Sequence, residues 1–166
     1  MIFTRKHSWL MCWLYLATFG SFIGFAAACL LLIKTSFPDV NALQFAFLGP
    51  LGGALARPLG GWVSDKLGGA RVTLWNFVLM IAAVFGVVAF LPQAGEGGHF
   101  FGFLSMFMVL FVTTGIGNGS TFRMIPVIFR TLHRNDGAKA GKEAAAVLGF
   151  TSAVGAFGGF FIPKSF

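Results

Sequence analysis

One arginine stands inside an apolar stretch of the sequence, where a charged side chain is uncommon. Arg57 precedes Pro58 within the run Gly53–Val63, whose other residues are aliphatic, glycine or aromatic. A guanidinium is always charged and presents its donors as a planar fork that suits an oxyanion. The five carboxylates of the chain all lie in loops or at the ends of apolar stretches: Asp39, Asp65, Glu96, Asp136 and Glu143. Arg57 therefore has no expected ion-pair partner at its own depth, and this predicts an anion site.

Several polar residues of other apolar stretches share the expected membrane depth of Arg57. Arg57 stands eight residues before Asp65, and Tyr15 stands nine residues after Lys6. At about 1.5 Å per helical residue, both lie roughly 12–15 Å from the membrane edge, near the middle of a layer about 30 Å thick. Two hydroxyl pairs have a similar depth: Ser120 and Thr121, and Thr151 and Ser152. These depths predict a polar chamber at the midplane.

Two alternatives stay open beside the chamber. Arg57 could extend its side chain to the cytoplasmic interface, as arginines near span ends often do. Serine and threonine hydroxyls in membrane helices commonly bond to the backbone of their own helix.

The composition is that of a membrane protein. Of 166 residues, 57% are hydrophobic and only 10% are charged, whereas a soluble domain has about 25% charged residues. The net charge is +7, but the basic residues are scattered between apolar runs, so no basic face suggests nucleic acid as a partner. Cys12 and Cys29 lie within the first apolar run without metal-ligand spacing, and we expect them to be packing residues.

Five apolar stretches are long enough to cross a membrane as helices, which takes about 20 residues each. They predict an all-α membrane protein with spans Ser8–Ile33, Asn41–Val63, Val72–Leu91, Phe100–Phe129 and Glu143–Ile162. The fourth stretch is too long for a straight crossing and contains Pro126, so we expect its last third to be tilted, kinked or extended into the cytoplasm.

The basic residues between the spans predict an orientation. Eight lie on one side and two on the other: Arg5, Lys6, Lys66, Arg71, Arg130, Arg134, Lys139 and Lys142 against Lys34 and Lys164. Because cytoplasmic loops carry the excess of Lys and Arg, the N-terminus is expected in the cytoplasm. Five spans then place the C-terminus outside.

One stretch, GGWVSDKLGGAR at residues 60–71, resembles the cytoplasmic loop motif of the major facilitator superfamily, G-x-x-x-D-[RK]-x-G-x-[RK]. The matching residues are Gly61, Asp65, Lys66 and Gly68, with Arg71 one position later than the usual basic residue. The resemblance implies a gating role for this loop.

Other stretches resemble a narrower family. GPLGGALARPLGG, GIGNGSTFRMIPVIF and GFTSAVGAFGGFFIPKSF are similar to the C-terminal half of NarK-type nitrate/nitrite porters, and LYLATFGSFIGF is similar to their seventh helix. The resemblance covers nearly the whole chain. It implies a twelve-helix transporter that imports nitrate or exchanges nitrate for nitrite across the bacterial inner membrane by alternating access, without a cofactor.

The resemblance also assigns residues. Arg57 matches the anion-clamping arginine of the second half, and Tyr15 and Phe19 match the tyrosine and stacking phenylalanine of the seventh helix. The glycine-rich nitrate motif of the eleventh helix, where packing must change as access alternates, corresponds to Gly149, Ser152, Gly155, Gly158 and Gly159. Arg123 matches no family role, and we expect it to be interfacial or gating.

On this resemblance the chain begins at the equivalent of helix seven and ends just after helix eleven. The N-terminal half, with the second arginine of the clamp, and the twelfth helix are then expected to be missing partners, and this segment is not expected to transport alone. A rival hypothesis from another class is a membrane-embedded scaffold or assembly subunit, which would use the glycine faces only for packing. An enzyme is not expected, because no nucleophile with a base, metal cluster or cofactor motif is visible.

Overall fold

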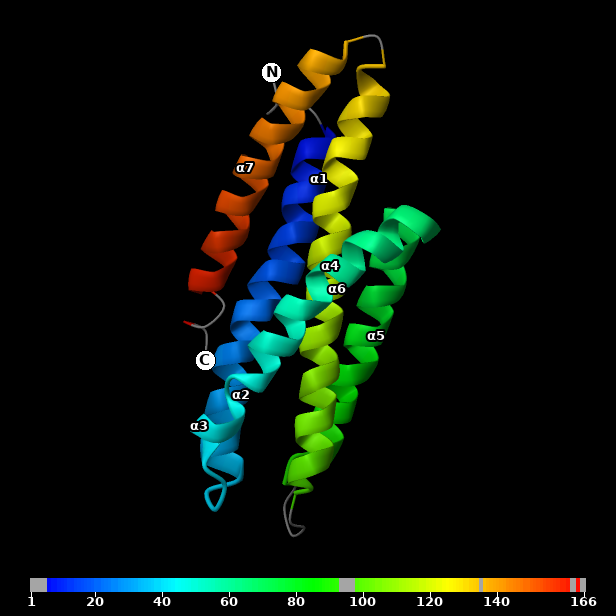
Figure 1. Cartoon of the computed structure of the whole chain (residues 1–166). Coiled ribbons are helices and arrows are strands. Elements are labelled where there is room, and N and C mark those ends of the chain that lie inside the picture. Colours follow the sequence, from blue (N-terminus) through cyan, green and yellow to red (C-terminus); the bar gives the residue numbers. More distant parts are fainter. Residues whose placement is uncertain (1–5, 93–97, 135, 162–163, 165–166) are drawn as a thin grey trace.

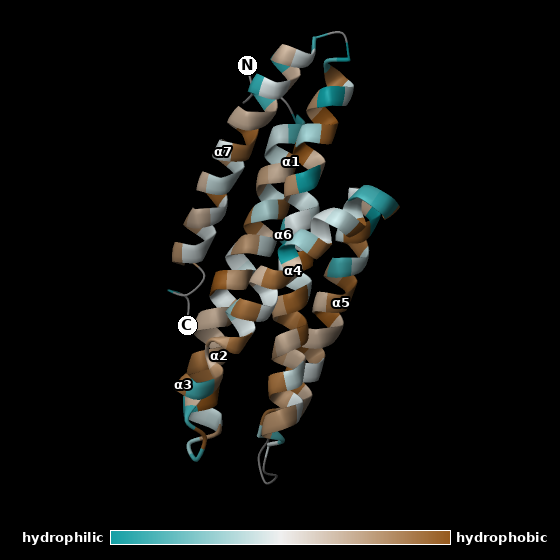
Figure 2. Ribbon diagram, in the orientation of Figure 1, coloured by the Kyte–Doolittle hydropathy of each residue, from teal (hydrophilic) through white to brown (hydrophobic). Residues whose placement is uncertain are grey.

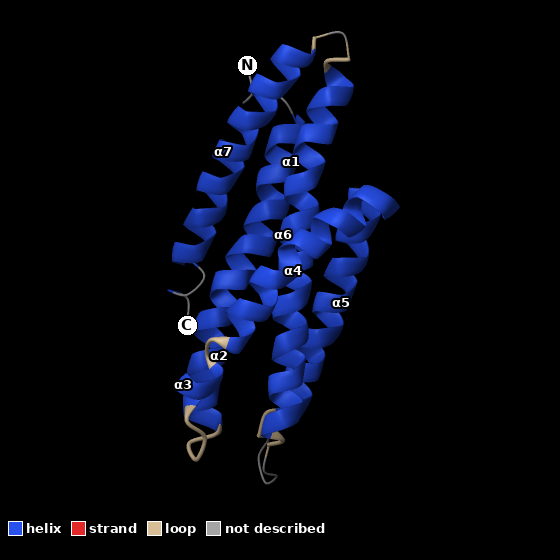
Figure 3. Ribbon diagram, viewed as in Figure 1, coloured by secondary structure: helices blue, strands red, loops and turns tan. Residues whose placement is uncertain are grey.

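The computed structural model describes residues 6–92, 98–134, 136–161 and 164. The first long helix consists of α1 (Lys6–Tyr15), a π-helical turn η2 (Leu16–Gly20) and α2 (Ser21–Ser36). The remaining helices are α3 (Ala42–Phe45), α4 (Leu48–Leu67), α5 (Gly69–Phe90), α6 (Phe100–Leu132) and α7 (Gly137–Phe161). No strand occurs in these described ranges, so the predicted all-α fold is confirmed (Figure 3).

Four of the described helices are long and apolar enough to cross a membrane: Lys6–Ser36, α5, α6 and α7. The chain is thus a multi-pass membrane protein. The helix α4 is 20 residues long but is not among the four, because Arg57 and the charges at its end lower its hydropathy. Figure 2 shows this contrast, with hydrophilic residues at the turn between α4 and α5 and hydrophobic ones along α5.

Most helix ends lie within four residues of the predicted span ends, and further differences occur in the second, fourth and fifth predicted spans. The stretch predicted as one helix over Asn41–Val63 is divided into α3 and α4 by a turn at residues 46–47. The helix α6 continues through Pro126 to Leu132, three residues past the predicted end at Phe129. The helix α7 begins at Gly137, six residues before the predicted start, while the predicted end at Ile162 lies outside the described residues.

Consecutive long helices run in alternating directions around α6 (Figure 1). The start of α1, the α4–α5 turn, the end of α6 and the start of α7 point toward one end, and the α2–α3 connection, the end of α5 and the start of α6 toward the other. The helix α6 contacts all the other long helices. Its phenylalanines form one core with α2 and α5, centred on Phe103, Phe107 and Phe111. Its later residues Ile125 and Phe129 form a second core with α1 and α7.

The helix α4 crosses α6 obliquely, and the two backbones touch (Figure 1). A Cβ atom added to Gly115 would overlap the Gly53 carbonyl oxygen, and one added to Gly119 would overlap the Arg57 carbonyl oxygen. On the α4 side, a Cβ at Gly60 would overlap the backbone of Ile116. Small residues at such crossings allow the closest approach of membrane helices. This crossing fixes the backbone of Arg57 directly against α6.

Gly115→Ala should therefore destabilise the protein by about 1–3 kcal/mol, because the new methyl group meets backbone that cannot move aside. Gly149→Ala is the matched control, since no described atom lies within 4 Å of a Cβ at that position. It should be neutral or stabilising by up to about 1 kcal/mol through helix propensity. Thermal unfolding in lipid nanodiscs measures both changes. Equal midpoints for the two variants would show that the α4–α6 contact is looser than described.

Candidate functional site

The helices α1, α4 and α6 surround a hollow of about 300 Å³ at the predicted depth of Arg57. Two polar side chains, two ring residues and two helix-shaping residues line it: Arg57, Asn118, Tyr15, Phe122, Pro58 and Gly119. The sequence predicted two of these, Arg57 and Tyr15, as binding residues, and the structure brings them to one hollow. Pro58 has no N–H, so it cannot continue the hydrogen bonding of α4 at this point.

The guanidinium of Arg57 has aromatic rings beside it but no described carboxylate as a partner. Its Nε is buried and has no hydrogen-bond partner in the described residues. Its Cζ lies 5.4 Å from the ring centroid of Phe19 and 4.8 Å from that of Phe22. Ring faces attract a cation by about 0.5–2 kcal/mol, but they accept no conventional hydrogen bond. The donors of Arg57 are therefore not saturated by the part of the chain described.

Tyr15 ends α1 and is 6% exposed. Its ring stacks on Phe19, with centroids 5.3 Å apart and planes 13° apart, and it also meets Phe122 at 4.7 Å. Phe19 lies within η2, the π-helical turn that directly follows Tyr15. Single π-helical turns are frequent at functional sites. No sequence signal predicted the turn, although Tyr15, which precedes it, and Phe19, which lies within it, had both been predicted as site residues.

The predicted chamber is narrower than the depth argument suggested. The hydroxyls of residues 120, 121, 151 and 152 were expected to line it, and they do not belong to the hollow. Each bonds elsewhere in the protein: Ser120 to Thr73 and the Gly69 carbonyl, Thr121 to the Gly117 carbonyl, Thr151 to Cys12, and Ser152 to the Leu148 carbonyl. Their prediction as chamber residues was wrong, because depth along a helix does not specify the direction of the side chain.

Asn118 is the site residue that the sequence analysis missed. It is 3% exposed, and neither Nδ2 nor Oδ1 has a hydrogen-bond partner among the described residues. A signal was available, because an amide between glycines in an apolar stretch, at the depth already singled out, is uncommon.

The glycine motif of α7 packs on the first long helix at three of its positions. A Cβ at Gly155 would meet the Tyr15 ring at 2.5 Å, one at Gly158 would meet Leu16 at 2.6 Å, and one at Gly159 would overlap Ile23. Gly155 thus makes room for the ring that lines the hollow. Gly149 has no described atom within 4 Å of its Cβ position. Its assignment to the packing motif stays a prediction, as does that of Ser152.

The loop motif forms a tight turn whose charges are paired or stacked. Gly68 has φ +87°, a conformation that favours glycine, and its N–H donates to the Ser64 carbonyl at 3.0 Å. The Arg123 Nε donates to both carboxylate oxygens of Asp65, at 2.7 and 3.0 Å. Lys66 places its ammonium 3.9 Å from the Trp62 ring centroid. Arg123, which matched no family role, therefore joins α6 to the part of the motif that lies in the last turn of α4.

The other two motif residues make less specific contacts. Gly61 is half-buried, and its Cβ position is 3.9 Å from the Gly119 carbonyl oxygen, an ordinary contact distance. Arg71 is exposed and lies at one end of a separate groove.

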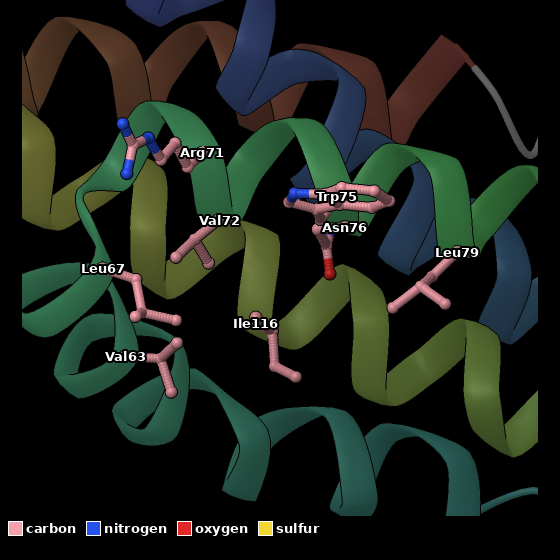
Figure 4. Close-up of a pocket in the computed structure, with 8 residues that line it drawn as sticks. All are labelled: Val63, Leu67, Arg71, Val72, Trp75, Asn76, Leu79 and Ile116. Carbon is pink, nitrogen blue, oxygen red and sulfur yellow. The ribbon is translucent and has the colours of Figure 1, made fainter.

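That groove lies between α4, α5 and α6 and has a volume of about 430 Å³ (Figure 4). Apart from Arg71 and Asn76 its lining is hydrophobic: Val63, Leu67, Val72, Trp75, Leu79 and Ile116. The Asn76 amide donates to the Met80 sulfur at 3.6 Å. Although this groove is larger than the hollow at Arg57, it has no buried cation, so its chemistry suits hydrocarbon better than a small anion.

Comparison with known proteins finds relatives that are all named for the transport of nitrate, nitrite or both. The chain is 54% identical over 177 aligned positions to the nitrate/nitrite transporter NarU of Escherichia coli (strain K12), covering 99% of the chain and 38% of NarU. It is 39% identical to the probable nitrate/nitrite antiporter NarK2 of Thermus thermophilus, covering 96% of the chain and 34% of that protein. A nitrite extrusion protein of Bacillus subtilis (strain 168) is 29% identical over 96% of the chain. No family model matches the chain.

The apolar helices define the class as a multi-pass membrane protein, and the relatives NarU and NarK2 are described as a transporter and a probable antiporter. Within that class, the chain belongs to the NarK-type nitrate/nitrite porters. It spans somewhat more than a third of the length of the curated relatives that it matches.

The Asp65–Arg123 pair can be tested by a double-mutant cycle with Asp65→Asn and Arg123→Gln. Because the two side chains are 42% and 58% exposed, we expect a small favourable coupling between them that solvent largely screens. The coupling should weaken when salt is raised from about 0.1 M to about 1 M, where the Debye length falls to about 3 Å. Unfolding midpoints of the four proteins at both salt concentrations provide the measurement. Additive effects at low salt would contradict the pairing.

Proposed function

We propose that this chain forms one wall of the substrate path of a nitrate/nitrite transporter, in which Arg57 binds the anion. The observation that supports this most strongly is the guanidinium of Arg57, which borders a hollow at the predicted midplane and has no described carboxylate partner. Placing a charge within a membrane costs several kcal/mol unless it is compensated. An anionic substrate is a compensating group that can enter and leave.

The chemistry of the hollow suits a small planar oxyanion. Nitrate and nitrite carry delocalised negative charge and accept hydrogen bonds without donating any. The Arg57 fork can donate to two oxygens in one plane. The Tyr15 hydroxyl, at the wall of the same hollow, is a further donor. Phe19 limits the width of the slot through its stacking on Tyr15. No cofactor is required by this arrangement.

Transport by alternating access requires helix contacts that change around a fixed site. The α7 glycines beside Tyr15 and Leu16 provide a small-residue surface on which α7 can move relative to α1. The Asp65–Arg123 pair joins the last turn of α4 to α6. Both side chains are exposed, so water can replace the ion pair when the helices move apart. In this proposal the loop motif steadies one access state.

The outer faces of the helices expose many hydrophobic side chains that need a cover. Large hydrophobic side chains are exposed on several helices, among them Trp13, Leu55, Phe85 and Phe157. Lipid and the remaining part of the transporter, with its own arginine, would cover these faces. The basic loops favour a bacterial inner-membrane location with the start of α1 in the cytoplasm. Whether nitrate is imported or exchanged for nitrite is left to the transport assay.

A membrane scaffold is the competing function, and residue 57 separates the two. A scaffold needs only the glycine contacts of α4, so Lys or Gln at position 57 should be tolerated. A nitrate clamp needs the planar fork, and an ammonium presents only a point charge.

Nitrate uptake into proteoliposomes tests the proposal, with this chain replacing its aligned region in full-length Escherichia coli NarU. Arg57→Lys should reduce uptake at sub-saturating nitrate by at least about tenfold, since one bidentate interaction is lost. Arg134→Lys is the matched control, because Arg134 is exposed and lies far along the chain from the hollow. Undiminished uptake in Arg57→Lys would refute the proposed role and favour the scaffold.

A further inference from the structure

One buried amide in the described part of the chain makes no hydrogen bond. Both polar atoms of Asn118 are buried and unpartnered, and the residue is 3% exposed. The other buried polar side chains of α6 are all bonded: Thr113, Thr114, Ser120 and Thr121. An unpaired buried polar group is unfavourable, and more so in a membrane interior that contains no water. The exception at Asn118 therefore needs a specific explanation.

The position of Asn118 supplies that explanation. It lines the hollow that contains Arg57. The next residue, Gly119, packs against the Arg57 carbonyl, so the two side chains start from neighbouring backbone on α6 and α4. The Arg57 Nε is a second buried atom without a partner. The hollow thus combines an unused donor on Arg57 with an unused acceptor and an unused donor group on Asn118.

We propose that Asn118 is a second anion-binding residue of the Arg57 site. When the anion is bound, the Asn118 Nδ2 donates to one of its oxygens, and the Asn118 Oδ1, which is unpartnered in the empty protein, turns to accept from the Arg57 Nε. This inference rests on the proposed function of Arg57. Because an amide donates without adding charge, the wall formed by this chain keeps one positive charge and discriminates against divalent anions such as sulfate.

A structural role for the amide makes the opposite prediction about stability. An amide that holds helices together must have partners within the protein, and its removal destabilises the fold. An amide reserved for a ligand is a burden on the empty protein, and an apolar side chain of similar size should then stabilise that state.

The test uses the full-length NarU hybrid in nanodiscs, with thermal unfolding and potassium nitrate titrations, and potassium sulfate as the competing anion. Asn118→Leu should raise the unfolding midpoint of the empty protein and weaken nitrate binding about 10- to 100-fold, the range for a hydrogen bond to a charged group. Asn118→Asp should abolish nitrate binding, because its carboxylate would pair with Arg57 and repel the anion. Thr121→Val is the matched control, since the Thr121 hydroxyl bonds only to its own helix, and it should change neither property.

The outcomes separate the two proposals. Nitrate binding that weakens in Arg57→Lys but is unchanged in folded Asn118→Leu would overturn the inference about Asn118 alone. A hybrid without substitutions that binds no nitrate would overturn both proposals. A midpoint of Asn118→Leu below that of the unsubstituted hybrid would mark the amide as structural and would also overturn the inference.

Discussion

The backbone contact between α4 and α6 is the constraint on which the site depends. Four glycines, Gly53, Gly60, Gly115 and Gly119, leave no side chains between the two helices where they cross. The contact brings the carbonyl of Arg57 against α6, beside Asn118. If a methyl group separated the helices, the hollow would widen and its two polar side chains would move apart. Close helix packing here serves to position a charge as well as to stabilise the fold.

The polar side chains of the site differ from the other described polar side chains of α6. Buried polar side chains along α6 are otherwise paired with a carbonyl or a hydroxyl, and Arg123 has its carboxylate. Arg57 and Asn118 have neither, although both border the same hollow. Residues that break a folding rule are most common at functional sites, where a buried polar group can keep its hydrogen bonds for a ligand. The aromatic rings of Phe19 and Phe22 lower the free-energy cost of placing the Arg57 charge within the membrane. They leave the N–H donors of Arg57 free to bind an anion.

Hydropathy and charge were sufficient to predict the all-α membrane fold, and the isolated charge at Arg57 was sufficient to point to the hollow that Arg57 lines. Tyr15 and Phe19 followed from the family resemblance. Other features depend on the rotation of each helix about its axis and on partners far away in the sequence. For that reason Thr121 was wrongly expected in the chamber, Asn118 was missed, and the Asp65–Arg123 pair could not be derived. The π-helical turn after Tyr15 likewise depends on packing against α7.

The central claim is that nitrate lies against the guanidinium of Arg57. Solid-state NMR can measure this directly, as dipolar dephasing between ¹⁵N-nitrate and ¹³Cζ-labelled arginine in the reconstituted full-length NarU hybrid. A bidentate contact with donor–acceptor distances of about 2.9 Å places the two nuclei about 4 Å apart, which gives strong dephasing. We predict that the dephasing of the Arg57 resonance is present in the unsubstituted hybrid, and that Arg57→Lys removes this contribution and leaves at most the signal of the arginine from the other half. Saturating nitrate transport without dephasing attributable to Arg57 would contradict the account.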